Sequence, residues 1–142
     1  MPILNYTTKI SPEKTISEIQ ARLVKSGAKR LSFEYDDDGC LASLLFTMDL
    51  PGGVVHFVIT PNIPGVLSAM QNDTTIPKKG QNKEQATRVA WRIEKDWLEA
   101  QLAKIEAGLA TPLQLLLPYA VANEGQTFYQ IIAQGNGPKL LK

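Results

Sequence analysis

Apolar residues recur every three or four positions over one long stretch of the chain, from Asn82 to Leu109. They form two rows, one of Ala86, Ala90, Ile93, Trp97 and Ala100 and the other of Trp91, Leu98, Leu102, Ile105 and Leu109. This spacing places both rows on one broad face of an α-helix, with charged residues on the opposite face. The pattern predicts a long amphipathic helix, capped by Asn82 and ended by Gly108, that organises the fold.

A shorter helix is predicted near the N-terminus. Ser11 followed by Pro12 is typical of an N-cap with proline at the first helical position. Gly27 ends the apolar periodicity, so we expect a helix over roughly residues 12–26. Alternating polar and apolar residues over positions 5–10 predict a short strand before it.

Three further strands are expected between the two helices. Alternation over residues 30–35 indicates a strand with one wet face, and Asp38-Gly39 is typical of a type I′ hairpin turn. The next strand, 40–49, is apolar on nearly both faces and should be central. The third covers residues 54–60, after a Pro-Gly-Gly turn.

The remaining segments add short helices. One is expected around residues 66–72, one begins at Thr111-Pro112, and one begins at Thr127, while residues 73–81 form a loop. The order predicts an α+β fold, in which a three- to four-stranded antiparallel meander has the long amphipathic helix and additional C-terminal helices packed on one face. We expect a single domain over residues 1–134 and a C-terminal tail over 135–142.

Composition narrows the possible functions. The chain has 142 residues and a net charge of +1, so no global field attracts nucleic acid or a membrane. It has one cysteine and one histidine, which excludes a disulfide framework and sites built from several histidines. We expect a cytoplasmic protein with no cofactor, no metal and no membrane contact, because neither a signal peptide nor a transmembrane run is recognisable.

The chemistry-bearing residues form no catalytic arrangement. Asp36 to Asp38 lie where a hairpin turn is required, and they lack the later glutamate of a calcium loop. His56 is expected in the middle of a strand and Cys40 as a small buried side chain. We therefore expect a protein that is not an enzyme, although carboxylates from different strands could still converge.

Basic residues cluster before and along the long helix. The candidate nucleic-acid or anion-binding residues are Lys78, Lys79, Lys83, Arg88 and Arg92. A donor-rich loop beside the positive end of a helix dipole suits phosphate groups. The alternative is a solvated helix face with pairs four residues apart: Glu84 with Arg88, Arg92 with Asp96, and Lys95 with Glu99.

Apolar helical faces offer a second candidate surface. The segment after Thr111 is apolar nearly all round, and the helical faces after Pro64 exceed what one small sheet can cover. We expect homo-oligomerisation or capture of a protein partner, with Leu113, Leu116 and Tyr119 as candidate interface residues.

Two resemblances add context. The AWRI..DWLEAQLA..EAG helix and the later LPY segment resemble a family of small proteins of phages and mobile elements, over roughly residues 10–131. That family has no assigned activity. The order of one helix, three strands and a long helix after Lys78-Lys79-Gly80 is similar to double-stranded RNA-binding domains, which clamp phosphates with lysines at the start of their last helix. An extra helix near Val66 departs from that pattern.

The leading expectation is therefore a non-enzymatic binding module that contacts nucleic acid through the basic loop and helix start. The alternative is a protein–protein interaction, assembly or host-inhibitor module that uses apolar helical faces.

Overall fold

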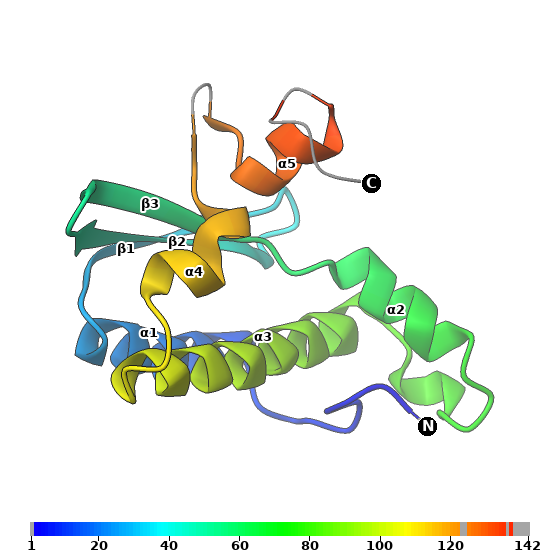
Figure 1. Cartoon of the computed structure of the whole chain (residues 1–142). Helices are drawn as coiled ribbons and strands as arrows, with labels where there is room; N and C mark the ends of the chain where they lie inside the picture. The colour runs from blue at the N-terminus through cyan, green and yellow to red at the C-terminus, as the bar shows by residue number, and fades with distance from the viewer. Residues whose placement is uncertain (1, 123–124, 136, 138–142) are drawn as a thin grey trace.

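The computed structural model describes residues 2–122, 125–135 and 137. A three-stranded antiparallel sheet in the order β1-β2-β3 lies on one side of the molecule (Figure 1). Its strands are β1 (Ala28–Tyr35), β2 (Leu41–Leu50) and β3 (Gly53–Ile59). The α+β class and the antiparallel meander are confirmed, and the strand with the strongest apolar pattern is the central one.

Two helices cover one face of this sheet. Figure 1 shows α1 (Pro12–Lys25) and α3 (Lys83–Glu106) side by side beneath the strands. Both begin at predicted caps, since the Ser11 side chain accepts from the Lys14 N–H and the Asn82 side chain accepts from the Gln85 N–H. These bonds satisfy backbone donors that the first helical turn leaves without partners.

The other helical elements are short. They are α2 (Ile63–Gln71), the 3₁₀ turn η1 (Lys78–Gly80), α4 (Pro112–Leu116), the 3₁₀ turn η2 (Leu117–Tyr119) and α5 (Phe128–Ala133). In Figure 1, α2 projects beyond the end of the sheet and α5 stands past its β3 side. The chain between η2 and α5 reaches β3, where the Val121 N–H donates to the His56 carbonyl at 2.8 Å. The predicted tail lies largely outside the described residues.

The main core lies between the sheet and the helices. Phe46 of β2 stacks on Phe57 of β3 with ring centroids 5.1 Å apart. The fully buried Trp91 of α3 donates its indole N–H to the Leu41 carbonyl at 3.2 Å. A buried indole needs such a partner, so this bond fixes α3 to the start of β2. A smaller core joins α2 to the first half of α3, with Met70 and Val89 fully buried.

The predicted strand over residues 5–10 is wrong. This segment forms turns, and Asn5 adopts a positive φ of 66°. The Gln85 side chain donates to the carbonyls of Tyr6 and Thr8 at 3.0 and 2.8 Å. These acceptors are thus satisfied by a side chain of α3, and the segment lies along the helix instead of pairing with the sheet.

The hairpin turn between β1 and β2 also differs from the prediction. Its loop is one residue longer than a type I′ turn, because the Asp36 N–H donates to the Cys40 carbonyl at 2.9 Å. Only Gly39 takes a positive φ, of 78°. The Asp36 carboxylate accepts from the Asp38 and Cys40 N–H groups, both at 2.9 Å. These bonds stabilise a three-residue loop with glycine in the left-handed position.

Neighbouring residues of α1 provide a test of this core. Leu23 is fully buried, whereas Val24 is 54% exposed. We expect Leu23→Ala to lower the free energy of unfolding by about 2–5 kcal/mol, because it removes methyl groups and leaves a cavity. The matched control Val24→Ala should cost about 0.5 kcal/mol or less. Urea unfolding of both variants measures the difference, and equal losses would contradict the described packing.

Candidate functional site

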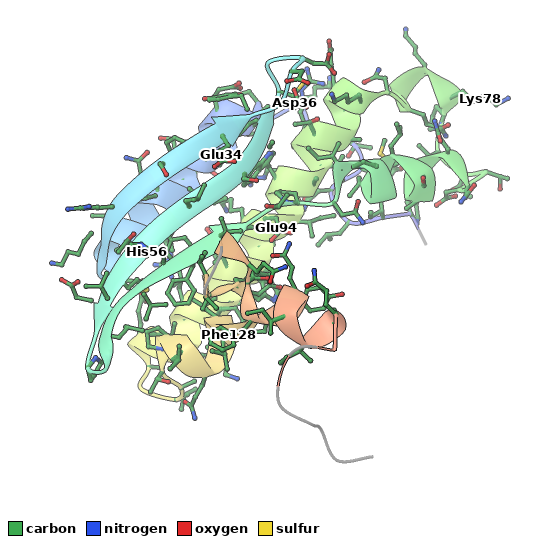
Figure 2. All side chains as sticks on the ribbon, turned by 90° about the horizontal axis from the view of Figure 1, so that it is seen from above. Glu34, Asp36, His56, Lys78, Glu94 and Phe128 are labelled. Carbon is green, nitrogen blue, oxygen red and sulfur yellow. The ribbon has the colours of Figure 1, made fainter. Side chains whose placement is uncertain are left out.

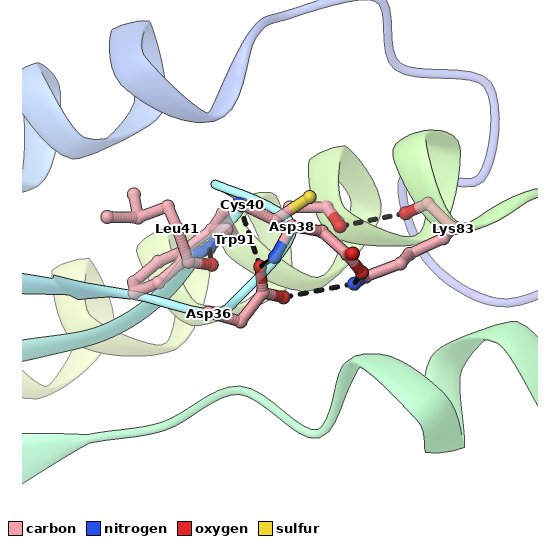
Figure 3. Close-up of polar contacts among 7 residues, drawn as sticks. Asp36, Asp38, Cys40, Leu41, Lys83 and Trp91 are labelled. Atoms are coloured by element: carbon pink, nitrogen blue, oxygen red, sulfur yellow. Dashed lines mark hydrogen bonds and ion pairs between the residues drawn. The ribbon is translucent and has the colours of Figure 1, made fainter.

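The basic residue at the start of α3 faces an acidic turn. The Lys83 ammonium lies 3.0 Å from an Asp36 carboxylate oxygen and 2.6 Å from one of Asp38 (Figure 3). The β1–β2 hairpin brings these aspartates to α3 although 45 residues or more separate them along the chain. The start of the predicted long helix therefore meets the predicted acidic turn.

The charges in this contact stabilise one another. The Cys40 N–H and the Lys83 ammonium hold the pKa of Asp36 below its usual 3.8. In turn, hydrogen bonds to Asp38 and Asp36 raise the pKa of Lys83 above its ordinary value. Lys83 stays charged, but its ammonium already donates hydrogen bonds to two carboxylates. These carboxylates would repel a phosphate group that approached it. Lys83 is thus a poorer phosphate ligand than its sequence context indicates.

The two arginines of the candidate set are also engaged. The Arg88 guanidinium donates to the Gln85 side chain at 3.1 Å, and Arg92 donates to Glu18 of α1 at 2.6 Å. Of the three predicted pairs along α3, the described ion pairs include only Lys95–Glu99, at 2.8 Å. Arg92 bonds to the neighbouring helix because α1 packs beside α3 and places Glu18 within reach.

Lys78 and Lys79 differ from the other three basic candidates. Both are exposed on η1, and neither takes part in an ion pair among the described residues. Lys79 also lines a cavity of about 330 Å³ between η1 and the N-terminal segment, together with Lys9 and Tyr6. The charge available for an anion on this side of the molecule therefore comes from η1 and the N-terminal segment. The sequence pattern did not identify Lys9 as a candidate anion-binding residue, because the alternation over residues 5–10 predicted a strand there.

The three predicted interface residues differ in burial. Leu113 is 43% exposed, but Leu116 is fully buried in the main core. Tyr119 is partly buried and packs edge-on against Trp97, with ring centroids 5.2 Å apart. The candidate interface residue Leu116 is therefore covered within the chain, whereas Leu113 and Leu117 on either side of it are exposed.

Exposed apolar side chains are concentrated at the C-terminal end. Six of the ten large hydrophobic residues that the described chain exposes lie between residues 109 and 132. Five of them belong to α4, η2 and α5, and we call these five the C-terminal apolar surface: Leu113, Leu117, Phe128, Tyr129 and Ile132.

Hydrogen bonds between α5 and the preceding segment join the parts of this surface. The Phe128 N–H donates to the Ala120 carbonyl at 3.0 Å, and Val121 forms an antiparallel bridge with Thr127. Figure 2 shows Phe128 at the start of α5, beside the α4–η2 segment. These bonds hold the start of α5 against the residues that follow η2, and η2 in turn contacts both α4 and α5.

Charge is nearly absent from this part of the chain. Between Ala107 and Pro138 the sequence holds a single charged residue, Glu124, and none lies in α4, η2 or α5. Beneath this region, burial raises the pKa of Glu94 in α3. Burial and the nearby Glu94 raise the pKa of the Tyr119 phenol. The surface elements α4, η2 and α5 are thus uncharged, and the carboxyl group close to them, Glu94 of α3, is partly buried.

The residues with catalytic potential are dispersed. His56 is exposed on β3, where its Nδ1 lies 2.8 Å from the Thr47 hydroxyl, and Cys40 is half-buried at the hairpin. Within the described residues, no three side chains of the metal-binding types gather. No helix of the described chain combines the length and the apolar composition that a membrane span needs.

Comparisons of the chain with protein-family models, curated proteins and solved structures found no significant match. Its function must therefore be inferred from the chemistry of its own surfaces.

The ion pair between α3 and the hairpin can be tested through one carboxyl group. We expect Lys83→Met to raise the pKa of Asp36 only part of the way to 3.8, because the larger cause, the Cys40 N–H, remains. Because folding lowers this pKa, the contacts of the ionised Asp36 with the Cys40 N–H and with Lys83 stabilise the fold above pH 3.8, and this contribution is lost as pH falls through the folded value. Carboxyl titration by NMR measures the shift, and an unchanged pKa of Asp36 would contradict the ion pair.

Proposed function

We propose that this protein is a non-enzymatic protein-interaction module, of phage or mobile-element origin as its sequence resemblance suggests. In this proposal, the C-terminal apolar surface pairs with a second copy of the chain. The observation that carries the proposal is the concentration of exposed apolar side chains in three short elements that contain no charged residue.

The chemistry of this surface favours a protein as the partner. Each Å² of apolar surface removed from water stabilises a complex by roughly 25 cal/mol before the costs of association. Soluble monomers seldom expose large contiguous apolar patches, and the centres of protein interfaces are poor in charge and rich in aromatic residues. Nucleic acid, in contrast, binds mainly through cations that neutralise phosphates. The C-terminal apolar surface offers two aromatic rings and no cation.

A second copy of the chain is a suitable partner for this surface, because the pairing needs no complementary charges. In a two-fold symmetric dimer the same patch meets itself, so any charge at its centre would face an identical charge. An uncharged patch avoids that repulsion and needs no complementary charge on its partner. Tyr129, which is 66% exposed, also offers a phenol hydroxyl for a hydrogen bond across the interface.

Light scattering coupled to size exclusion tests the proposed self-association. We expect the wild-type protein to have the mass of two chains, and the double variant Leu113→Glu/Tyr129→Glu that of one. Carboxylates introduced at both positions would be buried against each other in the dimer, which is costly. Circular dichroism should show unchanged secondary structure, because both side chains are exposed in the single chain.

The matched control is Val24→Glu, which places the same charge on an exposed apolar position of α1. It should leave the dimer intact. A wild-type protein that stays a single chain at high concentration, or a control that dissociates as readily as the double variant, would refute the proposed interface.

Nucleic-acid binding is a second candidate, supported by the exposed and unpaired Lys78 and Lys79 among the described residues. If they bind duplex phosphates, Lys78→Ala/Lys79→Ala should reduce the slope of log affinity against log salt by about 0.9 for each phosphate that is no longer neutralised. Fluorescence anisotropy with a short duplex at several salt concentrations measures this slope. Lys83→Ala should change it less, because Lys83 is paired with Asp36 and Asp38. No binding at low salt would exclude this role.

A further inference from the structure

The face of the sheet opposite α1 and α3 carries a row of polar side chains across all three strands. The register places Arg30 of β1 opposite Thr47 of β2, and Thr47 opposite His56 of β3. Figure 2 looks onto this outer face, with His56 on β3 and the two long helices behind the strands. Arg30 and His56 are exposed, so their side chains are accessible to a ligand.

An irregularity in β1 adds a second cation to this row. The pairing changes from Ala28 opposite Met48 to Arg30 opposite Thr47, so Lys29 is an extra residue in β1. Regular alternation would send Lys29 and Arg30 to opposite faces of the sheet. A bulge re-aims side chains, and here both residues line the same cavity on the outer face.

The imidazole of His56 is oriented by its neighbour in the row. The Thr47 hydroxyl lies 2.8 Å from Nδ1 of His56, which leaves Nε2 as the ring nitrogen available to a ligand. The Val121 N–H donates to the His56 carbonyl and holds the next segment against the β3 edge. Val121 thereby forms one wall of the cavity.

The cavity has a volume of about 710 Å³ and a consistent chemical character. Lys29, Arg30 and His56 supply nitrogen donors, and Leu45 and Val121 supply apolar surface. No carboxylate is among its lining residues: Asp49 lies two positions beyond Thr47 on β2, outside the lining. Neither Lys29 nor Arg30 takes part in an ion pair among the described residues.

We propose that this outer face of the sheet binds the phosphate groups of a nucleotide. Arg30 offers a planar fork that matches two phosphate oxygens, and Lys29 offers a point charge beside it. His56 Nε2 contacts a further oxygen, and Leu45 and Val121 lie beside the base or sugar. Pockets of roughly 300–1,000 Å³ are typical of small-molecule sites, so the volume suits a nucleoside diphosphate. The same chemistry fits the nucleotides of a nucleic-acid strand.

Isothermal titration calorimetry with adenosine diphosphate tests the site, with inorganic phosphate and a short single-stranded oligonucleotide as further probes. We expect saturable binding of the diphosphate and at least tenfold weaker binding by Lys29→Ala/Arg30→Ala. The matched control Lys14→Ala/Lys104→Ala removes the same charge from exposed positions of α1 and α3 and should retain the wild-type affinity. Arg30→Lys should lose affinity in part, because it keeps the charge without the planar fork.

Either the oligonucleotide or the free nucleotide can be the tighter ligand. Both results support the site, provided that Lys29→Ala/Arg30→Ala weakens the binding of that ligand. The absence of saturable binding of every probe would overturn the proposal. So would a loss of affinity in Lys14→Ala/Lys104→Ala equal to the loss in Lys29→Ala/Arg30→Ala. The Leu113→Glu/Tyr129→Glu variant should still bind the diphosphate, so failure of the dimer and failure of this site are distinguishable.

Discussion

The packing of α3 against the inner face of the sheet is the interaction on which the rest of the structure depends. Trp91 contributes both apolar burial and an indole hydrogen bond to Leu41, which fixes the helix along its axis and about it. This placement sets the start of α3 beside the acidic hairpin and its middle beside α1. The ion pairs of Lys83 and Arg92 are therefore consequences of core packing.

Helices on only one face leave two very different surfaces. The outer face of the sheet carries the row of Arg30, Thr47 and His56, while the C-terminal elements expose uncharged apolar side chains. A chain with a net charge of +1 has no strong overall electrostatic field that would select a partner. The partner must therefore be selected by the residues of each local surface. The two proposals follow this division: an apolar surface for a second copy, and a cationic row for phosphate.

Periodicity predicted most of the fold, since the caps Ser11 and Asn82 mark where α1 and α3 begin. It could not predict the sites, because their decisive contacts are not local. The pairing of Lys83 with Asp36 needs the hairpin to reach α3. The burial of Leu116 depends on how α4 turns toward the core, and a segment that is apolar all round does not reveal which side is covered. The bulge at Lys29 breaks the alternation from which its face would have been predicted.

The central claim, that the C-terminal apolar surface is where the protein meets a second copy of itself, is tested most directly by amide NMR shifts over a dilution series. Residues that enter an interface should change shift as the complex dissociates, whereas the rest of the chain should not. We expect saturable, concentration-dependent shifts confined to α4, η2, α5 and the residues packed against them. Shifts that stay constant at all concentrations, or that fall on α1 or α2 instead, would contradict the claim.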